Sequence, residues 1–294
     1  MSLKIAIYGR NFQDSFIPFI QDLFNTLNLY SWECAIYEPF YHFLKERLVI
    51  GDKVSLYKSH TDLDKSTDVL ISIGGDGTFL ETIHIVKNSG IPILGVNTGR
   101  LGFLASTQKD EIRDVLDKIN QKKYRLQTRS LIQLDSTLSL FNGENVALNE
   151  VTVHKMDSSS MITIHTYIDD LYLNSYWADG LIIATPTGST AYSLSCGGPI
   201  VVPGASDFII TPIAPHNLNV RPVVVPDSRE IKLKVEGRSQ AFLCSLDSRS
   251  ESIAFENELI ISKANYNIEV IQTEDQNFLN TIRNKMMWGI DRRN

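Results

Sequence analysis

Val69-Leu70-Ile71-Ser72-Ile73-Gly74-Gly75-Asp76-Gly77-Thr78 is the stretch that decides the fold of this chain. An apolar run typical of a buried strand ends in three glycines around one aspartate, and a helical pattern starts at Thr78. Glycine lets the main chain approach a ligand closely, and N–H groups at a helix start suit phosphate oxygens. We therefore expect phosphates on the main chain here, with Asp76 as the carboxylate for chemistry or metal binding.

The same motif has simpler interpretations. An Asp-Gly pair also forms ordinary turns. No Gly-Lys-Ser/Thr follows, as the Walker pattern requires, and the G-x-G-x-x-G fingerprint does not occur in the chain. A dinucleotide is therefore not expected to bind as a redox coenzyme on a first βαβ turn.

The composition of the 294-residue chain suits one large domain or two medium ones. Hydrophobic residues make up 43%, and a net charge of −6 argues against nucleic acid as a partner. The three cysteines form no C-x-x-C and are interpreted as buried thiols in a reducing cytosol. With no visible signal peptide and no apolar run of about 18 residues, we expect a cytoplasmic protein without a membrane partner.

The N-terminal part of the chain alternates between strand and helix patterns. Strands are expected at 4–9, 32–37, 69–73 and 91–96. Helical spacing of apolar residues is seen over 16–27, 78–88 and 112–119. Such alternation predicts a parallel sheet covered on both faces. The polar segment Lys45–Lys65 is predicted to be a loop.

After Leu126 the pattern becomes β-rich. Strands are predicted at 131–141, 161–168, 171–176, 231–235 and 241–246, with turns at Asn142-Gly143 and Asp169-Asp170. A last amphipathic helix is expected over 278–286. We therefore predict an α/β domain with a parallel sheet over 1–126 and a β-rich domain over 127–269. The C-terminal segment 270–294 is predicted to return its helix to the first domain.

Three further segments are rich in residues that bind ligands. Asn97–Leu104 follows the fourth predicted strand, and loops after the strands of a parallel sheet converge at one edge. Asn149-Glu150 places a carboxamide beside a carboxylate, which suits the two hydroxyls of a ribose. In Asp179–Gly198 an apolar strand opens into a loop of hydroxyls and glycines, where Tyr192 offers a ring to a flat base.

Each of these segments also has a structural interpretation, which the residues alone leave open. The first could be a turn with Phe103 in the core, the second a solvated strand end, and the third a plain Ser/Thr loop. Other chemistries have less support, because the six histidines lack zinc spacing and no G-x-S-x-G elbow occurs. No metal-ligand set is predicted from the protein itself.

Together these segments resemble the NAD kinase family over nearly the whole chain. The matching motifs, in the family's order, are Gly74–Thr78, Asn97–Gly99, Leu101–Phe103, Asn149-Glu150, Asp179-Gly180, Gly188–Ser195, Pro215-His216, Arg221-Pro222 and Trp288. The glycine loop alone is shared with diacylglycerol and sphingosine-type lipid kinases and, more loosely, with phosphofructokinases. The Gly188–Ser195 run is much more discriminating.

The resemblance implies ATP-dependent phosphorylation of NAD at the 2′-hydroxyl of its adenosine ribose, which gives NADP. It implies Mg²⁺ or another divalent cation, with ATP bound by the α/β domain and NAD by the β-rich domain. It also implies a homodimer or homotetramer in which one subunit helps complete another's NAD site. A lipid or sugar kinase, or a nucleotide sensor without catalysis, is the alternative.

By position, the resemblance makes Asp76 the catalytic base. It implies phosphate-binding residues for ATP at Gly74, Gly75, Gly77, Thr78 and Asn97. It implies NAD-binding residues at Asp76, Gly77, Phe103, Asn149, Glu150, Asp179, Thr190, Ala191, Tyr192, Ser193, Leu194, Ser195 and Ala214. Trp177 stands where many relatives have an arginine, and Arg249 where a glutamine or another polar residue often stands, so both NAD contacts are left open.

Overall fold

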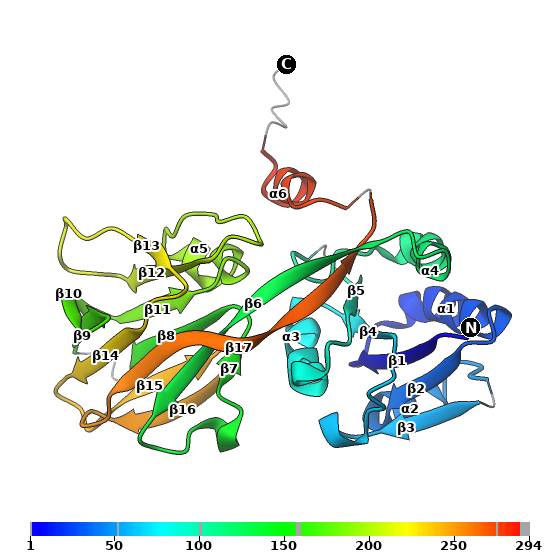
Figure 1. Cartoon of the computed structure of the whole chain (residues 1–294), viewed down its shortest axis with the longest axis horizontal. Helices are drawn as coiled ribbons and strands as arrows, with labels where there is room; N and C mark the ends of the chain where they lie inside the picture. Colours follow the sequence, from blue (N-terminus) through cyan, green and yellow to red (C-terminus); the bar gives the residue numbers. More distant parts are fainter. Residues whose placement is uncertain (1, 52, 100–101, 157–159, 275, 289–294) are drawn as a thin grey trace. The chain divides into compact units, whose positions relative to one another are not determined.

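The computed structural model describes the chain except for residues 1, 52, 100–101, 157–159, 275 and 289–294. The chain divides into two compact units (Figure 1), the first formed by Met1–Thr128 with Ile268–Asn294 and the second by Arg129–Asn267. Two long strands, β6 (Arg125–Ser136) and β17 (Leu259–Gln272), carry the chain from one unit to the other. Each unit is described by itself.

The first unit is built on a parallel sheet. Its strands are β1 (Lys4–Gly9), β2 (Glu33–Tyr37), β3 (Val54–Tyr57), β4 (Val69–Gly74) and β5 (Ile93–Asn97). They lie in the order β3-β2-β1-β4-β5, and the last part of β17 pairs with β5 in parallel. Strands β4 and β5 are buried along their whole length, as their continuous apolar sequences require in the centre of a parallel sheet.

The helices of the first unit are α1 (Ile17–Leu29), α2 (Glu38–Leu44), α3 (Asp76–Val86), α4 (Ile112–Asn120) and α6 (Phe278–Met286), with short 3-10 turns at Asp14–Phe16, His60–Asp62, Lys87–Ser89 and Lys109–Glu111. Leu23 of α1 and Leu116 of α4 are buried in one core with Ile71 of β4. Helices α1 and α4 lie side by side (Figure 1). Helix α3 starts where β4 ends and buries Phe79 and Ile83, so the chain turns sharply at the predicted glycine loop.

The second unit is a sandwich of two antiparallel sheets. One contains β6, β7 (Val146–Ala147), β9 (Ile162–Ile168), β10 (Leu171–Ala178), β14 (Ile231–Glu236) and β17. The other has the order β13-β12-β11-β8-β15-β16. Its strands are β8 (Glu150–Lys155), β11 (Gly180–Ala184), β12 (Asp207–Ile213), β13 (Val223–Pro226), β15 (Ala241–Leu246) and β16 (Arg249–Ala254).

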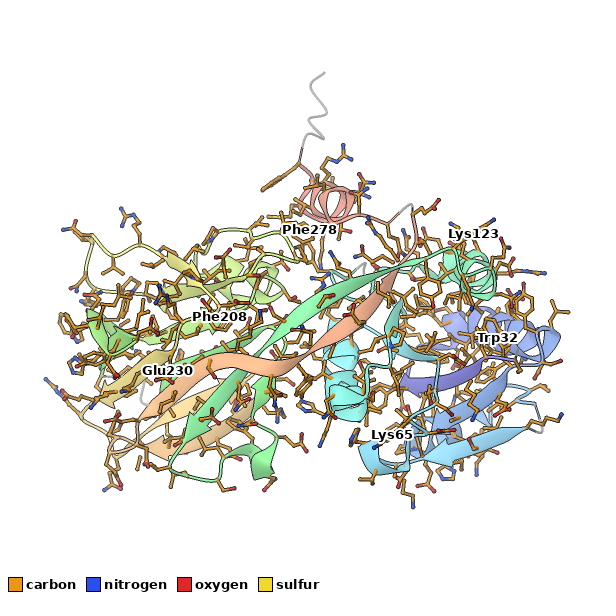
Figure 2. All side chains as sticks on the ribbon, in the orientation of Figure 1. Trp32, Lys65, Lys123, Phe208, Glu230 and Phe278 are labelled. Carbon is orange, nitrogen blue, oxygen red and sulfur yellow. The ribbon has the colours of Figure 1, made fainter. Side chains whose placement is uncertain are left out.

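Side chains from both sheets form the core of the sandwich, including Leu181 of β11 and Leu233 of β14. Phe208 of β12, labelled in Figure 2, belongs to the same core. The alternate residues of β11, Ile182 and Ala184, belong to a second apolar cluster, against which Cys196 packs. Both faces of β11 are therefore covered, which explains why its sequence is continuously apolar.

The predicted fold class is confirmed, with an α/β first unit, a β-rich second unit and the terminal helix α6 in the first unit. The predicted loop Lys45–Lys65 is wrong, because it contains β3. That edge strand exposes Ser55 and Leu56 and so shows no apolar alternation. Helix α2 has no predicted counterpart, because its seven residues bury only Phe40 and Leu44.

Other element boundaries also differ from the prediction. Helix α3 starts at Asp76 rather than Thr78, so the aspartate belongs to the first helical turn. Strand β6 ends at Ser136, before a 3-10 turn at Phe141–Gly143. Strands β12, β13, β16 and β17 were not predicted.

The cysteines, one predicted turn and the absence of a membrane span can be compared with the structure. Cys34 and Cys244 are buried as predicted, but Cys196 is partly exposed beside the Ser/Thr-rich loop, so that prediction was wrong. Asp169 and Asp170 form the predicted turn, with φ angles of 48° and 64°. Among the described residues no helix is long and apolar enough to cross a membrane.

Candidate active site

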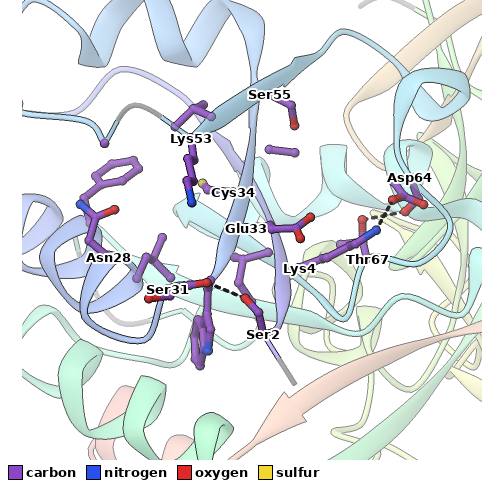
Figure 3. Close-up of a pocket in the computed structure, with 17 residues that line it drawn as sticks. Ser2, Lys4, Asn28, Ser31, Glu33, Cys34, Lys53, Ser55, Asp64 and Thr67 are labelled. Carbon is purple, nitrogen blue, oxygen red and sulfur yellow. Dashed lines mark hydrogen bonds and ion pairs between the residues drawn. The ribbon is translucent and has the colours of Figure 1, made fainter.

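A cavity of about 860 Å³ in the first unit opens at the amino-terminal ends of β1 and β2 (Figure 3). Glu33 and Lys53 line it together with Lys4, which pairs with Asp64 at 2.8 Å. None of the residues predicted to bind ATP or NAD lines this cavity. Ligands of parallel sheets bind beyond the carboxyl ends of the strands, so the candidate site lies at the opposite edge, after β4 and β5.

The turn between β4 and α3 leaves its main chain open. A Cβ atom on Gly74 would stand 2.3 Å from the Thr78 Oγ1 atom, so this position has no room for a side chain. Gly75 and Gly77 are exposed, and Cβ atoms added there would meet nothing within 4 Å. Gly75 is also the N-cap of α3, so exposed main chain lies at a helix N-terminus, where phosphate oxygens bind.

The carboxylate of Asp76 is held by three successive main-chain donors. The N–H of Phe103 donates to Oδ2 at 2.9 Å, and those of Leu104 and Ala105 donate to Oδ1 at 3.0 and 2.9 Å. A Cβ atom on Gly102 would stand 2.0 Å from Oδ1, so only glycine lets this loop close around the carboxylate. The Asp76 side chain is still 33% exposed, which leaves it open to a substrate.

Asn97 positions the same loop from the end of β5. It is buried, its Oδ1 accepts the N–H of Gly99 at 2.6 Å, and its Nδ2 donates to the carbonyl of Ala105 at 3.4 Å. The neighbouring Thr98 N–H donates to the carbonyl of Gly74 at 3.3 Å. The two predicted loops are therefore joined directly, although Arg100 and Leu101 of the second loop lie outside the described residues.

The C-terminal helix α6 reaches this part of the first unit. The Phe103 ring lies 6.3 Å from the ring of Phe278, between centroids. The Lys285 Nζ atom lies 4.3 Å from the Phe103 centroid and 3.8 Å from the Asp76 Oδ2 atom. Neither Phe278 nor Lys285 was among the predicted site residues, because helical periodicity places the helix without indicating which loop it contacts.

In the second unit, a different aspartate holds the predicted Asn149-Glu150 pair. The Asp247 Oδ2 atom accepts the N–H of Leu148 at 2.9 Å, and Oδ1 accepts those of Asn149 and Glu150 at 2.8 and 3.2 Å. Asp247 lies in the turn from β15 to β16 with a φ of 51°. The residue is partly buried, and desolvation of its carboxyl group raises its pKa. Nothing in the sequence pattern assigned Asp247 to this position.

Glu150 has the features of a ligand-binding carboxyl. The residue is 8% exposed, and no described group hydrogen-bonds to its Oε2 atom. Burial, followed by the nearby charge of Asp247, raises the Glu150 pKa to about 8. A buried carboxyl with a free oxygen and a strongly raised pKa is typical of a functional site.

The loop after β11 packs directly on this pair. The Thr185 N–H donates to the carbonyl of Asn149 at 2.8 Å, and the Thr185 hydroxyl donates to the carbonyl of Leu148 at 2.6 Å. A Cβ atom on Gly188 would stand 2.1 Å from the main-chain carbonyl oxygen of Asn149, so glycine is required for this close approach. Asn149-Glu150 and the Gly188–Ser195 run therefore belong to one structure, as the predicted NAD site requires.

Within that loop, a 3-10 turn (Gly188–Thr190) leads through Ala191 into the short helix α5 (Tyr192–Ser195). The Ser193 hydroxyl lies 2.8 Å from the Thr211 hydroxyl, and both are fully buried. Leu194 is half-buried, whereas Ser195 is exposed and Tyr192 is 40% exposed. Ser193 thus anchors the loop, while the Tyr192 ring is accessible.

A second group of predicted residues lines a cavity of about 480 Å³ in the same unit. Trp177, Asp179 and Ala214 lie on its wall, together with Lys155, Ser160, Met161, His216 and Arg238. The Lys155 Nζ atom is 2.6 Å from the Asp179 Oδ1 atom, and the His216 ring lies 4.8 Å from the Trp177 ring. The resemblance had marked Pro215-His216, but Lys155 and Arg238 carried no sequence signal.

Tyr192 is influenced by charged residues of both predicted groups, Glu150 from the first and Asp179 from the second. Burial and Cys196 are the main causes that raise the pKa of its hydroxyl, and the charges of Asp179 and Glu150 raise it further. Arg249, in contrast, is used within the fold. Its guanidinium donates to the carbonyls of Glu144 at 2.6 Å and Val146 at 2.7 Å, and it lies over the Phe141 ring.

One unit thus offers an open glycine loop with a fixed carboxylate, and the other offers a polar pocket and, apart from its lining, a buried carboxyl group and an accessible ring. These features define the class of the protein as a nucleotide-dependent phosphotransferase. The family models of the ATP-NAD kinase N-terminal and C-terminal domains match residues 50–124 and 148–273. The chain belongs to the NAD kinase family, and it is a kinase that phosphorylates NAD to NADP.

Individual relatives agree over the full length. The NAD kinase of Flavobacterium psychrophilum is 51% identical over 99% of this chain and 100% of its own, and one from Bacteroides fragilis is 45% identical over 99% and 100%. An Archaeoglobus fulgidus NAD kinase in complex with ATP matches with a TM-score of 0.69 and 25% identity over 97% of this chain and 98% of that chain.

A yeast NADH kinase complexed with NADH shows the same fold, with a TM-score of 0.86 and 20% identity over 99% of this chain and 89% of that chain. The family membership removes the lipid-kinase, sugar-kinase and sensor alternatives.

Proposed function

We propose that ATP binds to the α/β part of the chain (1–126 with 270–294) and NAD to the β-rich part (127–269), and that Asp76 is the base. The observation that carries the proposal is the Asp76 carboxylate, which three main-chain N–H groups hold between two glycines with open surroundings. Such a carboxylate accepts the proton of the 2′-hydroxyl of the adenosine ribose while the γ-phosphoryl group is transferred. Phosphoryl transfer otherwise needs mainly positioning and charge neutralisation.

The ATP phosphates bind to the main chain of Gly74, Gly75, Gly77 and Thr78. Support comes from the open space beside Gly75 and Gly77 at the N-terminus of α3. Asn97 contributes by holding the neighbouring loop through Gly99 and Ala105.

NAD binds through the carboxyl and carboxamide of Glu150 and Asn149, which take the hydroxyls of a ribose. Support comes from the Glu150 oxygen that has no described hydrogen-bond partner, because a ribose hydroxyl can donate to it. Phe103 and the loop Thr190–Ser195, with Tyr192, contact the adenosine. Asp179 and Ala214 contact the nicotinamide half, and their shared cavity with Trp177 supports this division.

The side chains at the phosphate loop offer few ligands for a divalent cation. Among the described residues no three His, Cys, Asp or Glu side chains gather to hold a metal. Asp76 alone stands at the phosphate loop, and its two oxygens already accept three N–H bonds. The protein therefore fits Mg²⁺ only as an ion carried on the phosphates of ATP, where it would offset their charge.

We further propose a homodimer or homotetramer with shared NAD sites. Strand β10 ends its sheet and exposes Leu171, Tyr172 and Trp177, and Leu218 is also exposed in the same unit. Exposed apolar side chains on an edge strand are typical of a protein interface. Light scattering and NADP-formation assays at the same protein concentrations should show that activity rises as the subunits associate. A fully active monomer would contradict the proposed assembly.

The direct test of the reaction is to incubate the purified chain with ATP, NAD and MgCl₂ and to measure NADP by chromatography. Diacylglycerol and fructose 6-phosphate serve as control acceptors. We expect phosphate only on NAD, at the 2′ position of the adenosine ribose as identified by NMR. A product phosphorylated at another hydroxyl would disprove the proposed geometry.

A further inference from the structure

Among the described residues of the first unit, Lys285 is the cation that lies at the proposed catalytic carboxylate. It comes from the last turn of α6, more than 200 residues after Asp76 in the sequence, and its Nζ atom is 3.8 Å from Asp76 Oδ2. The same ammonium lies 4.3 Å from the centroid of the Phe103 ring. Lys285 thus contacts both the proposed base and the aromatic residue of the loop that holds it.

The helix that carries Lys285 is fastened to the first unit. Asn277 caps α6 by accepting the N–H of Asn280 at 2.8 Å. Before the helix, the Gln276 side chain donates to the Thr107 hydroxyl at 3.2 Å, and the Gln276 carbonyl accepts from Arg125 at 2.9 Å.

The helical repeat places Phe278 and Lys285 on one face of α6. The two residues are seven positions apart, and both contact Phe103. Ile282 of the same helix is buried. The position of Lys285 at Asp76 therefore follows from a docked helix.

A simple ion pair does not account well for this arrangement. The distance of 3.8 Å is too long for a hydrogen bond, and Asp76 already accepts three N–H groups. Both side chains are about one third exposed, where an ion pair adds little stability. Among the described residues no other acidic group pairs with Lys285, so its three N–H donors remain available to a ligand.

We propose that Lys285 is a further catalytic residue, whose ammonium donates hydrogen bonds to the phosphoryl group during transfer. In this step the bond from the ribose 2′-oxygen to the γ-phosphorus forms, and the bond from that phosphorus to the bridging oxygen of ADP breaks. The hydroxyl proton passes to Asp76, and ADP leaves with the electron pair. Lys285 stays protonated throughout and offsets charge on the equatorial phosphoryl oxygens.

Phe103 has a defined part in this proposal. Its ring face attracts the ammonium, and its N–H binds Asp76 Oδ2, so one residue positions both the cation and the base. A lysine side chain is otherwise flexible, and this contact limits where the ammonium lies before ATP binds.

The test compares Lys285→Met and Lys285→Arg with Arg283→Met, a control on the same helix whose arginine donates to the Asn280 side chain. The inference rests on the proposed function, so wild-type NADP formation is measured first. For Lys285→Met we expect kcat to fall roughly 10²- to 10³-fold, as when one preorganised donor is lost. We expect KM for NAD and the melting temperature to change little, and Lys285→Arg to restore part of kcat.

Three outcomes would overturn the inference. If Lys285→Met keeps wild-type kcat, the lysine has no catalytic part. If kcat and melting temperature fall together, without recovery in Lys285→Arg, the residue only docks α6. If Arg283→Met lowers kcat as strongly, the effect belongs to the helix. A wild-type chain that forms no NADP would instead disprove the proposed function, together with the inference that rests on it.

Discussion

Asp76 in the first unit and Asp247 in the second bind their surroundings in the same way. Each accepts three consecutive main-chain N–H groups, with the first on Oδ2 and the next two on Oδ1. The Asp76 side chain, however, is 33% exposed and lies near Lys285, whereas burial raises the pKa of the Asp247 carboxyl group. The same hydrogen-bond pattern therefore holds the proposed base in one unit and supports the proposed ribose-binding pair in the other.

This comparison teaches that hydrogen bonding alone does not identify a reactive carboxylate. Both aspartates hold a loop, but Lys285 lies beside Asp76, whereas desolvation raises the pKa of Asp247. Asp247 acts through the residues that it holds, because its three donors include the N–H groups of Asn149 and Glu150. Matched changes at the two positions can test this difference.

The largest effect is expected for Asp76→Asn. The amide oxygen can keep two of the three N–H bonds, so the fold and NAD binding should persist, while the proton acceptor is lost. We expect kcat to fall about 10²- to 10⁴-fold. Single-turnover kinetics and calorimetry with NAD would measure both effects. A kcat close to wild type would show that Asp76 is not the base.

The next largest effect is expected for Asn149→Ala and Glu150→Gln. Both changes should weaken the binding of NAD but not the binding of ATP. Both side chains are mostly neutral at pH 7, and loss of a hydrogen bond between neutral groups costs about 0.5–1.5 kcal/mol. Calorimetry with each nucleotide would measure the change, with Glu256→Gln, an exposed glutamate of the same unit, as the control. Unchanged NAD affinity in both variants would contradict the assignment.

The raised Glu150 pKa adds a pH dependence to the same position. Burial raises it from 4.5 to about 8, so ionisation in the folded state costs stability as the pH rises through this range. Glu150→Gln removes that cost. Its melting temperature relative to wild type should therefore increase from about pH 5 to pH 8 and then level off. A difference that does not vary with pH would exclude a buried, titrating Glu150.

Asp247→Asn, the matched change in the second unit, is expected to have a smaller effect of another kind. The amide cannot serve all three N–H groups, and a buried donor without a partner costs about 1–3 kcal/mol. We expect a lower melting temperature and weaker NAD binding, with kcat at saturating NAD retained. Thermal unfolding and steady-state kinetics would measure this. A loss of kcat equal to that of Asp76→Asn would abolish the distinction between the two carboxylates.

The smallest effect is expected for Tyr192→Ala. The ring is 40% exposed, so its removal should lower the melting temperature only slightly. Stacking on a base is worth about 0.5–1.5 kcal/mol beyond burial, so KM for NAD should rise by roughly two- to tenfold. Scanning fluorimetry without ligand and steady-state kinetics would separate these effects. A large fall in melting temperature with unchanged KM would place Tyr192 in the structural core.

Local patterns predicted much of the fold. The apolar run of β4 and the spacing of Val115 and Ile119 in α4 identified a strand and a helix, because both bury a regular face. Strand β3 and helix α2 were missed, because a short edge element buries too few side chains to show a period. The long strand β17 was missed as well, although it pairs with both units' strands.

The motifs likewise indicated where the ligand-binding residues stand. The glycine loop, Asn149-Glu150 and Gly188–Ser195 are recognisable from residue types alone, because close main-chain approach requires glycine and ribose recognition requires polar pairs. Asp247 and Lys285 gave no such signal, and the motif that contains Gly102 did not show its contact with Asp76. Each acts on a residue that is distant in sequence, and only the folded chain brings the two together.

The sequence by itself thus determined the family, the class of each unit and the phosphate loop, because these depend on local periodicity and on motifs with fixed spacing. Only the tertiary structure decided which carboxylate lies beside a lysine and which has its pKa raised by burial. Accessibility and charge depend on contacts between segments far apart in the chain, such as α6 against the loop around Asp76. No local pattern encodes these distances.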